Sequence, residues 1–191
     1  MIRQLMLFLL VFLAGSSPFG GSSRADEPKP NAAKPSEPQL KEPLAALKPF
    51  VGKTWRGEFK QSTPEKPQFD VSRWEAALKG HAVRIRHSVN NGVYGGESLV
   101  MWNAEKKQME SFYFTNAGFY TQAVITVADG KMTSREKVVG NQQGITEVEA
   151  VSQVLPDGRL HVKSRYLKGT EWVDGHEIMY SEAPDAEVKI D

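Results

Sequence analysis

After residue 50 the hydrophobic and polar positions alternate with a period of two, in short runs broken by turn sequences. A period of two is typical of a β-strand with one buried and one solvated face. We expect strands at 53–61, 70–79, 82–90, 94–103, 108–115, 118–128, 131–139, 145–155, 159–167 and 171–181. Many short strands joined by tight turns favour an antiparallel sheet, and closure removes its exposed edges. The pattern therefore predicts an all-β chain with a closed or nearly closed barrel of about ten strands.

The connections support this prediction. Asn-Asn-Gly at 90–92, Asp-Gly at 129–130 and Pro-Asp-Gly at 156–158 lie between alternating runs and favour sharp reversals. Before the first strand, residues 43–51 (PLAALKPFV) are apolar enough for one or two helical turns, which Gly52 would end. We expect this short helical turn to cap one end of the barrel.

Small residues recur on the face that the alternation assigns to the interior. They are Gly57, Ala76, Ala123, Ser134, Ala150, Ser152 and Ser164. A core built only for packing would favour larger aliphatic side chains at these positions. Small residues either leave free volume or admit neighbouring aromatic rings, and both outcomes stay open.

Some inward positions also carry chemistry. On the second strand, Trp74 and Leu78 are both placed on the inner face. Of the ionisable residues, His87 and His176 have inward parity, and Glu136 is the one acidic residue predicted on an apolar face. Buried imidazoles and carboxylates need partners, so these groups either line one polar spot or form separate hydrogen bonds. The candidate ligand-binding residues of the interior are Trp55, Trp74, His87, Glu136, His176 and Tyr180.

No catalytic or metal signature appears. The chain contains no serine nucleophile elbow, phosphate loop, HExxH motif or paired carboxylates, so no catalytic residue is assigned. No two histidines have the spacing of a metal site, so no metal site is assigned, and His176 is kept as a metal candidate. The aromatic residues of 112–120 straddle a turn, so some rings must face outward, as a partner surface, as the lip of a ligand entrance or as cross-strand aromatic pairs.

The N-terminus has the form of an export signal. Arg3 precedes the apolar run 5–14, and Ser23-Arg24-Ala25 offers a cleavage site. The run is well short of the roughly 20 residues that span a bilayer, so we expect no membrane span after cleavage. Five prolines between 28 and 43 then predict an extended linker. The expected organisation is a signal peptide at 1–25, a linker at 26–43, a barrel domain at 44–183 and a tail at 184–191.

Composition limits the classes of partner and the cellular compartment that we expect for this chain. The chain has 24 basic and 23 acidic residues, a net charge of +1 and no cysteine. Such a balance argues against nucleic-acid binding, which needs a clustered basic surface. Without cysteine there is no disulfide, thiolate site or lipid-modified cysteine. We expect a periplasmic or secreted domain held together by its own core.

Residues 47–59, LKPFVGKTWRGEF, resemble the opening of calycin-type barrels, where an apolar turn leads through a glycine to a strand tryptophan. The segment is similar to the small bacterial lipocalin-like and nitrobindin-like families, including the DUF1579 group. Gly52 and Trp55 lie one residue further apart than in the usual lipocalin motif. The resemblance implies a barrel that holds a small ligand. Nitrobindin-like proteins bind haem through a histidine on a late strand, which implies His176, in GHEIMY, as a haem ligand to test.

Together these observations predict an exported, non-catalytic barrel that binds a small apolar or amphipathic molecule in its interior. One alternative is a haem- or metal-binding barrel that uses His176 or His87. Another is a structural or protein-interaction module with a filled core.

Overall fold

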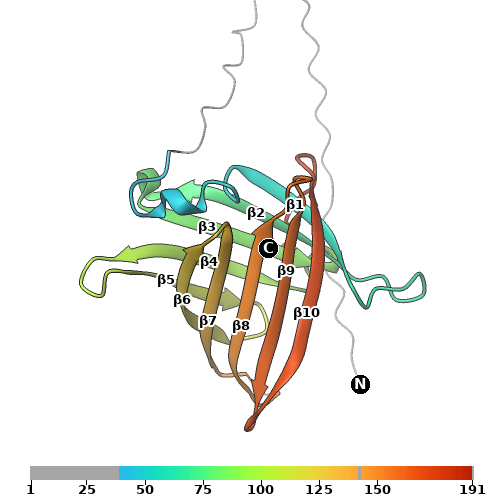
Figure 1. Cartoon of the computed structure of the whole chain (residues 1–191). Coiled ribbons are helices and arrows are strands. Elements are labelled where there is room, and N and C mark those ends of the chain that lie inside the picture. The colour runs from blue at the N-terminus through green and yellow to red at the C-terminus, as the bar shows by residue number, and fades with distance from the viewer. Residues whose placement is uncertain (1–38, 142, 191) are drawn as a thin grey trace, which may run out of the picture. The chain divides into compact units, whose positions relative to one another are not determined.

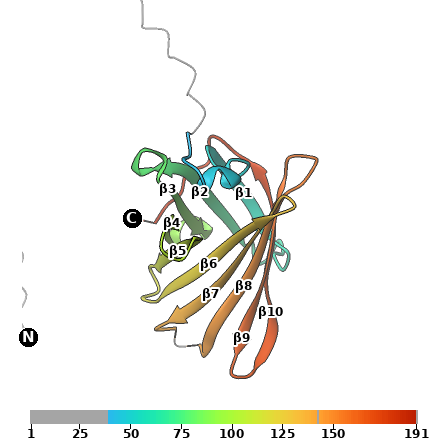
Figure 2. The same ribbon diagram turned by 60° about the vertical axis from the view of Figure 1, so that its left-hand side comes forward.

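In a computed structural model, residues 39–141 and 143–190 are described, and there ten antiparallel strands close into a barrel (Figures 1 and 2). The strands are β1 (Lys53–Phe59), β2 (Phe69–Ala77), β3 (Ala82–Val89), β4 (Tyr94–Asn103), β5 (Gln108–Thr115), β6 (Tyr120–Ala128), β7 (Lys131–Val139), β8 (Ile145–Val154), β9 (Leu160–Lys168) and β10 (Glu171–Glu182). Each strand pairs with its neighbours in sequence, and β1 pairs with β10 to complete the ring. The predicted all-β closed barrel is confirmed.

The strand ends follow the backbone rather than the hydrophobic pattern. The run predicted at 70–79 ends at Ala77, because Leu78 and Lys79 have φ of 48° and 56° and form η2 (Leu78–Gly80). Alternation stops where the chain leaves the extended conformation. The placement of Leu78 on the inner face was therefore wrong, since its side chain is 60% exposed. The turn at 90–92 forms η3 (Asn90–Gly92), with left-handed backbone at Asn90 and Asn91.

A short 3₁₀ turn, η1 (Leu44–Leu47), lies at one end of the barrel and carries the buried side chains of Leu44 and Leu47. The buried apolar cluster at this end of the fold includes Leu40, Leu44, Leu47, Phe50, Val51, Trp55, Trp74, Val83, Val100, Met109, Ile125, Met132, Leu160 and Ile178. The Trp55 indole donates a 3.2 Å hydrogen bond to the Phe50 carbonyl, and the Phe50 ring stacks on Trp74 at 5.4 Å. The predicted helical cap is confirmed, and it fills this end with the chain's own side chains.

The inner face changes character along the barrel. From the apolar cluster it passes to hydroxyls, imidazoles and two carboxyls. Glu136 faces inward as expected, but so does Asp70, which is 2% exposed and belongs to the same face as Ser72 and Trp74. The expectation of a single inward acid was therefore wrong.

The C-terminal tail lies on the outer face of the first strands. The Ala183 amide donates to the Thr54 carbonyl at 2.8 Å, and the Lys189 amide donates to Ser88 Oγ at 3.0 Å. Gly95 makes room for the tail, because a Cβ there would lie 2.6 Å from Ile190 Cγ2. The tail thus covers part of the β1–β4 wall.

The predicted signal peptide at 1–25 and linker residues 26–38 lie outside the described residues. Within the remainder of the predicted linker, the Lys41 amide donates a 3.0 Å hydrogen bond to the Gly80 carbonyl. Across the described ranges, no helix has both the length and the apolar character needed to cross a membrane.

Candidate ligand-binding site inside the barrel

An imidazole lies between an acid and a phenol on the polar part of the inner wall. His87 Nδ1 is 2.8 Å from Asp70 Oδ1, and His87 Nε2 is 2.7 Å from the Tyr113 hydroxyl. The Tyr180 hydroxyl donates to the other Asp70 oxygen at 2.9 Å, and the Tyr113 hydroxyl donates to the Tyr94 hydroxyl at 2.9 Å. We call these five side chains the His87 relay. They form one continuous hydrogen-bonded path from a buried carboxylate to the Tyr94 hydroxyl.

Strand register explains why these groups meet. His87 on β3 is paired with Gly96 on β4, and Gly96 is paired with Thr115 on β5. Gly96 has no side chain to fill the space between its neighbours. A Cβ at Gly96 would lie 2.7 Å from Tyr113 Cε2 and would also clash with the Phe114 carbonyl oxygen. The glycine therefore lets the Tyr113 ring cross β4 and approach the imidazole.

Burial raises the pKa of all three phenols of the relay. For Tyr94 and Tyr113, burial is the largest cause; for Tyr180, burial is reinforced by the neighbouring Asp70 carboxyl. The phenols therefore keep their protons and act as hydrogen-bond groups rather than as anions.

Glu136 forms a second polar centre on β7. The Thr121 hydroxyl donates to Glu136 Oε2 at 2.7 Å, and the Ser134 hydroxyl donates to Glu136 Oε1 at 3.1 Å. Burial raises the pKa of this carboxyl, and the two hydroxyl hydrogen bonds only partly oppose that effect. Its protonated form is thus favoured by the barrel wall around it.

His176 forms a third centre on β10. Its Nδ1 lies 2.7 Å from the Tyr166 hydroxyl and 2.9 Å from Ser164 Oγ. The β9–β10 register shifts between Asp174 and Glu177, which turns His176 toward these partners. Burial lowers the pKa of His176; the charge of Asp70 opposes this shift and that of His87 adds to it. The imidazole is held as a neutral group.

The polar part of the interior keeps contact with solvent. The side chains of Tyr94, Tyr113, Glu136 and His176 are half-buried although they face inward, and the His87 side chain is 21% exposed. In a closed barrel such exposure arises only through the interior or its open end. The polar half, rather than the capped apolar half, is therefore the part of the interior that solvent or a small molecule can reach.

The candidate residues predicted from sequence divide between these two halves. His87, Glu136 and His176 all lie in the polar half, where Asp70 and His87 act electrostatically on His176. Tyr180 is buried and bonds to Asp70. Trp55 and Trp74 instead pack in the apolar cluster around η1.

Sequence reasoning missed Asp70, Tyr94, Tyr113 and Tyr166. The signal for Asp70 was present, because it precedes Ser72 and Trp74 at a spacing of two. Tyr113 also has inward parity on its strand. The connection between these residues carries no local signal, since it joins β2, β3, β4, β5 and β10.

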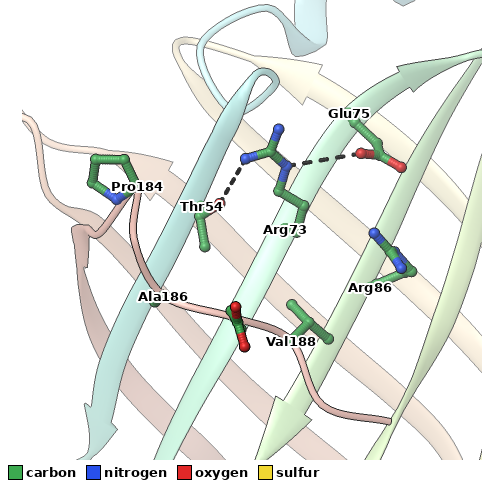
Figure 3. A pocket seen from close by; sticks show the side chains of 8 residues that line it. Thr54, Arg73, Glu75, Arg86, Pro184, Ala186 and Val188 are labelled. Carbon is green, nitrogen blue, oxygen red and sulfur yellow. Dashed lines mark hydrogen bonds and ion pairs between the residues drawn. The ribbon is translucent and has the colours of Figure 1, made fainter. Parts of the chain in front are cut away.

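A separate polar pocket of about 380 Å³ lies outside the barrel, between the tail and the β1–β3 wall (Figure 3). Arg73 donates to Thr54 Oγ1 at 2.8 Å and lies 3.8 Å from Glu75 in the same pocket. Arg86 and Glu187 add one further charge of each sign. The charges are balanced within the pocket, which makes it a mixed polar contact between tail and barrel.

The described residues contain no group of three or more histidine, cysteine or acidic side chains placed to hold a metal ion. No family model matches the chain, and no curated protein matches it. The closed ten-stranded antiparallel barrel is consistent with a calycin-like fold.

Proposed function

We propose that this chain is an exported barrel that binds a small amphipathic molecule in the polar half of its interior. The observation that carries the proposal is the His87 relay, which ends at a half-buried hydroxyl, Tyr94, facing inward. A pocket with a few converging polar groups on apolar walls is the common form of a small-molecule site.

The walls of this half supply both kinds of contact. Phe119 stacks on Tyr94 with ring centres 6.4 Å apart, and Phe59 meets His176 edge-on at 6.1 Å. Glu136 and His176 add polar groups on the other strands. Aromatic faces would hold the apolar part of the ligand, and the relay would fix its polar end.

Native mass spectrometry of the protein recovered without denaturation from the periplasm tests this function. The proposal predicts a complex heavier than the processed chain, which releases one small molecule on collisional activation. Recovery of the bare chain, together with no uptake of added small aromatic molecules, would rule it out. The same spectrum tests export, because cleavage after Ala25 leaves Asp26 first.

A haem-binding barrel is the second candidate, and one observation favours it. His176 is held as a neutral imidazole with Nδ1 engaged by Tyr166 and Ser164, an arrangement that orients a ligating histidine. His87 is less suited to ligation, since both of its nitrogens already have partners. Haem binding is also what the resemblance of the sequence to the nitrobindin-like and DUF1579-like families would imply. A Soret band after incubation with haem, lost in His176→Ala, would support it over the first proposal.

A protein-interaction role is the third candidate. Phe112, Phe114 and Tyr120 point outward and are 40%, 58% and 41% exposed. Phe114 and Tyr120 are cross-strand neighbours with ring centres 6.0 Å apart. Their outward placement is what supports this role, and an interior that takes up no small molecule would favour it.

A further inference from the structure

We propose that Tyr94 is the ligand-contacting donor of this site and that the ligand is an uncharged aromatic molecule with a carbonyl-type acceptor. This inference rests on the proposed interior binding function. It names the class of ligand and assigns Asp70 and His87 as positioning residues that act through Tyr113.

The direction of the relay is set at its buried end. Asp70 presents two carboxylate oxygens, one accepting from the Tyr180 hydroxyl and the other from His87 Nδ1–H. A carboxylate with 2% exposure requires such donors, because an unpaired buried charge is costly. His87 Nδ1 therefore carries a proton.

The direction of the hydrogen bonds at the Tyr94 end of the relay follows from counting hydroxyl protons. Tyr113 has one hydroxyl proton and gives it to Tyr94, so its oxygen accepts from His87 Nε2–H. The protonated imidazole then pairs with Asp70 at 2.8 Å. Tyr94 accepts from Tyr113 and keeps its own proton, which is free for a ligand acceptor. Donors in such a chain polarise one another, so Tyr94 is a stronger donor than an isolated phenol.

The surroundings of His87 favour an uncharged ligand. The groups around His87 are Asp70 on β2, Tyr94 on β4 and Tyr113 on β5, with His176 on β10 within its electrostatic reach. Tyr180 on β10 bonds to Asp70, and Glu136 on β7 acts electrostatically on Tyr94 and Tyr113. Burial favours the neutral forms of Glu136 and His176 by raising the pKa of the first and lowering the pKa of the second, and Asp70 is paired with His87 at 2.8 Å. Two lysines share the inner parity, Lys53 at the start of β1 and Lys168 at the end of β9, and between the ends of the described strands the register places no lysine or arginine on the inner face. An anion or cation held among the central side chains of this half would thus meet no unpaired opposite charge.

The test uses three probes of similar size in binding titrations: acetophenone, benzoate and ethylbenzene. Acetophenone carries an uncharged acceptor, benzoate an anion and ethylbenzene neither. We expect acetophenone to bind wild type about tenfold more tightly than ethylbenzene, which is the worth of one good hydrogen bond. Tyr94→Phe should remove that advantage and leave ethylbenzene unchanged. Tyr120→Phe is the matched control, because this phenol is outward and 41% exposed, and it should keep the advantage.

Substitution tests the positioning role of His87. His87→Phe removes the Nε2–H donor to Tyr113 and frees the bond between the two tyrosines to reverse, so the advantage of acetophenone over ethylbenzene should shrink. Tyr94→Phe should abolish this effect of His87→Phe, whereas a general loosening of the barrel would weaken the binding of both probes alike. Melting curves of each variant check that the barrel is folded.

The outcomes separate the two proposals. Binding of none of the probes would contradict interior binding itself. Equal affinity for acetophenone and ethylbenzene, an unchanged advantage in Tyr94→Phe or in His87→Phe, or tightest binding of benzoate would each overturn the inference about Tyr94 and the relay while interior binding stands.

Discussion

At the scale of single residues, the inner wall holds ionisable groups by two different means. Asp70 is compensated by two donors, Tyr180 and His87, and so tolerates nearly complete burial. Glu136 has only hydroxyl partners, and its environment favours the neutral carboxyl. Substitutions at the two acids, or at their partners, therefore test different interactions.

Glu136→Gln should make the fold more stable at neutral pH. Burial raises the pKa of Glu136 above its ordinary value of 4.5, so the folded chain binds this proton more tightly than the unfolded chain does. The contribution of this group is present below about pH 4.5 and is lost as pH rises through the raised pKa. Urea unfolding as a function of pH should show the variant gaining on wild type with rising pH and matching it in acid.

Glu110→Gln is the matched control with the opposite sign. Hydrogen bonds from Asn103, Lys106 and Gln108 lower the pKa of Glu110 to about 2. Its contribution is present above pH 4.5 and is lost as pH falls toward about 2, so its Gln variant should be less stable than wild type at neutral pH. If the stabilities of wild type and Glu136→Gln changed with pH in parallel, Glu136 would not be a buried carboxyl with a raised pKa.

Tyr180→Phe should destabilise the barrel by about 1–3 kcal/mol, the usual cost of leaving a buried acceptor without its donor. The lost hydroxyl is the partner of Asp70 Oδ2. Tyr120→Phe serves as the control, because that ring is outward and 41% exposed. Denaturant titration compares the two, and equal stabilities would mean that the Tyr180–Asp70 bond contributes nothing to the fold.

At the scale of elements, η1 links the start of the described chain to the barrel core. Leu47 is fully buried among the apolar side chains of the capped end. Leu47→Ala should cost about 2–5 kcal/mol through lost burial and the cavity left behind. Lys48→Ala, at the exposed neighbouring position, should leave stability within about 0.5 kcal/mol. A small loss at Leu47, measured by urea unfolding, would show that the cap is not part of the cooperative fold.

The strands were well predicted from the sequence because alternation and turn chemistry agree with each other. β4, β5 and β7 have the ends that the pattern predicts. Leu78 was misplaced because it continues the apolar alternation of the sequence, although its backbone is left-handed and the strand has already ended. Hydrophobic period alone does not reveal where φ changes sign.

At the scale of the whole molecule, closure decides which residues share a site. His87, Glu136 and His176 were identified from their parity, since parity is a local property. Tyr180 was a candidate as well, but Asp70, Tyr94 and Tyr113 were not, and it is closure of the ring through β1 and β10 that brings Tyr180 to Asp70 across 110 positions of the sequence. The sequence pattern predicts which residues line the inner face, and only the strand pairing of the closed barrel shows which of their side chains meet.

A methyl NMR titration tests most directly whether the polar half of the interior takes up a small molecule. Val138 and Val148 are half-buried on the inner wall beside Glu136, whereas Val124 and Val151 are exposed on the outside. With acetophenone as probe, we predict saturable shifts and probe contacts at the methyls of Val138 and Val148, with Val124 and Val151 unchanged. Shifts confined to the outer methyls, or no shifts at all, would contradict the account.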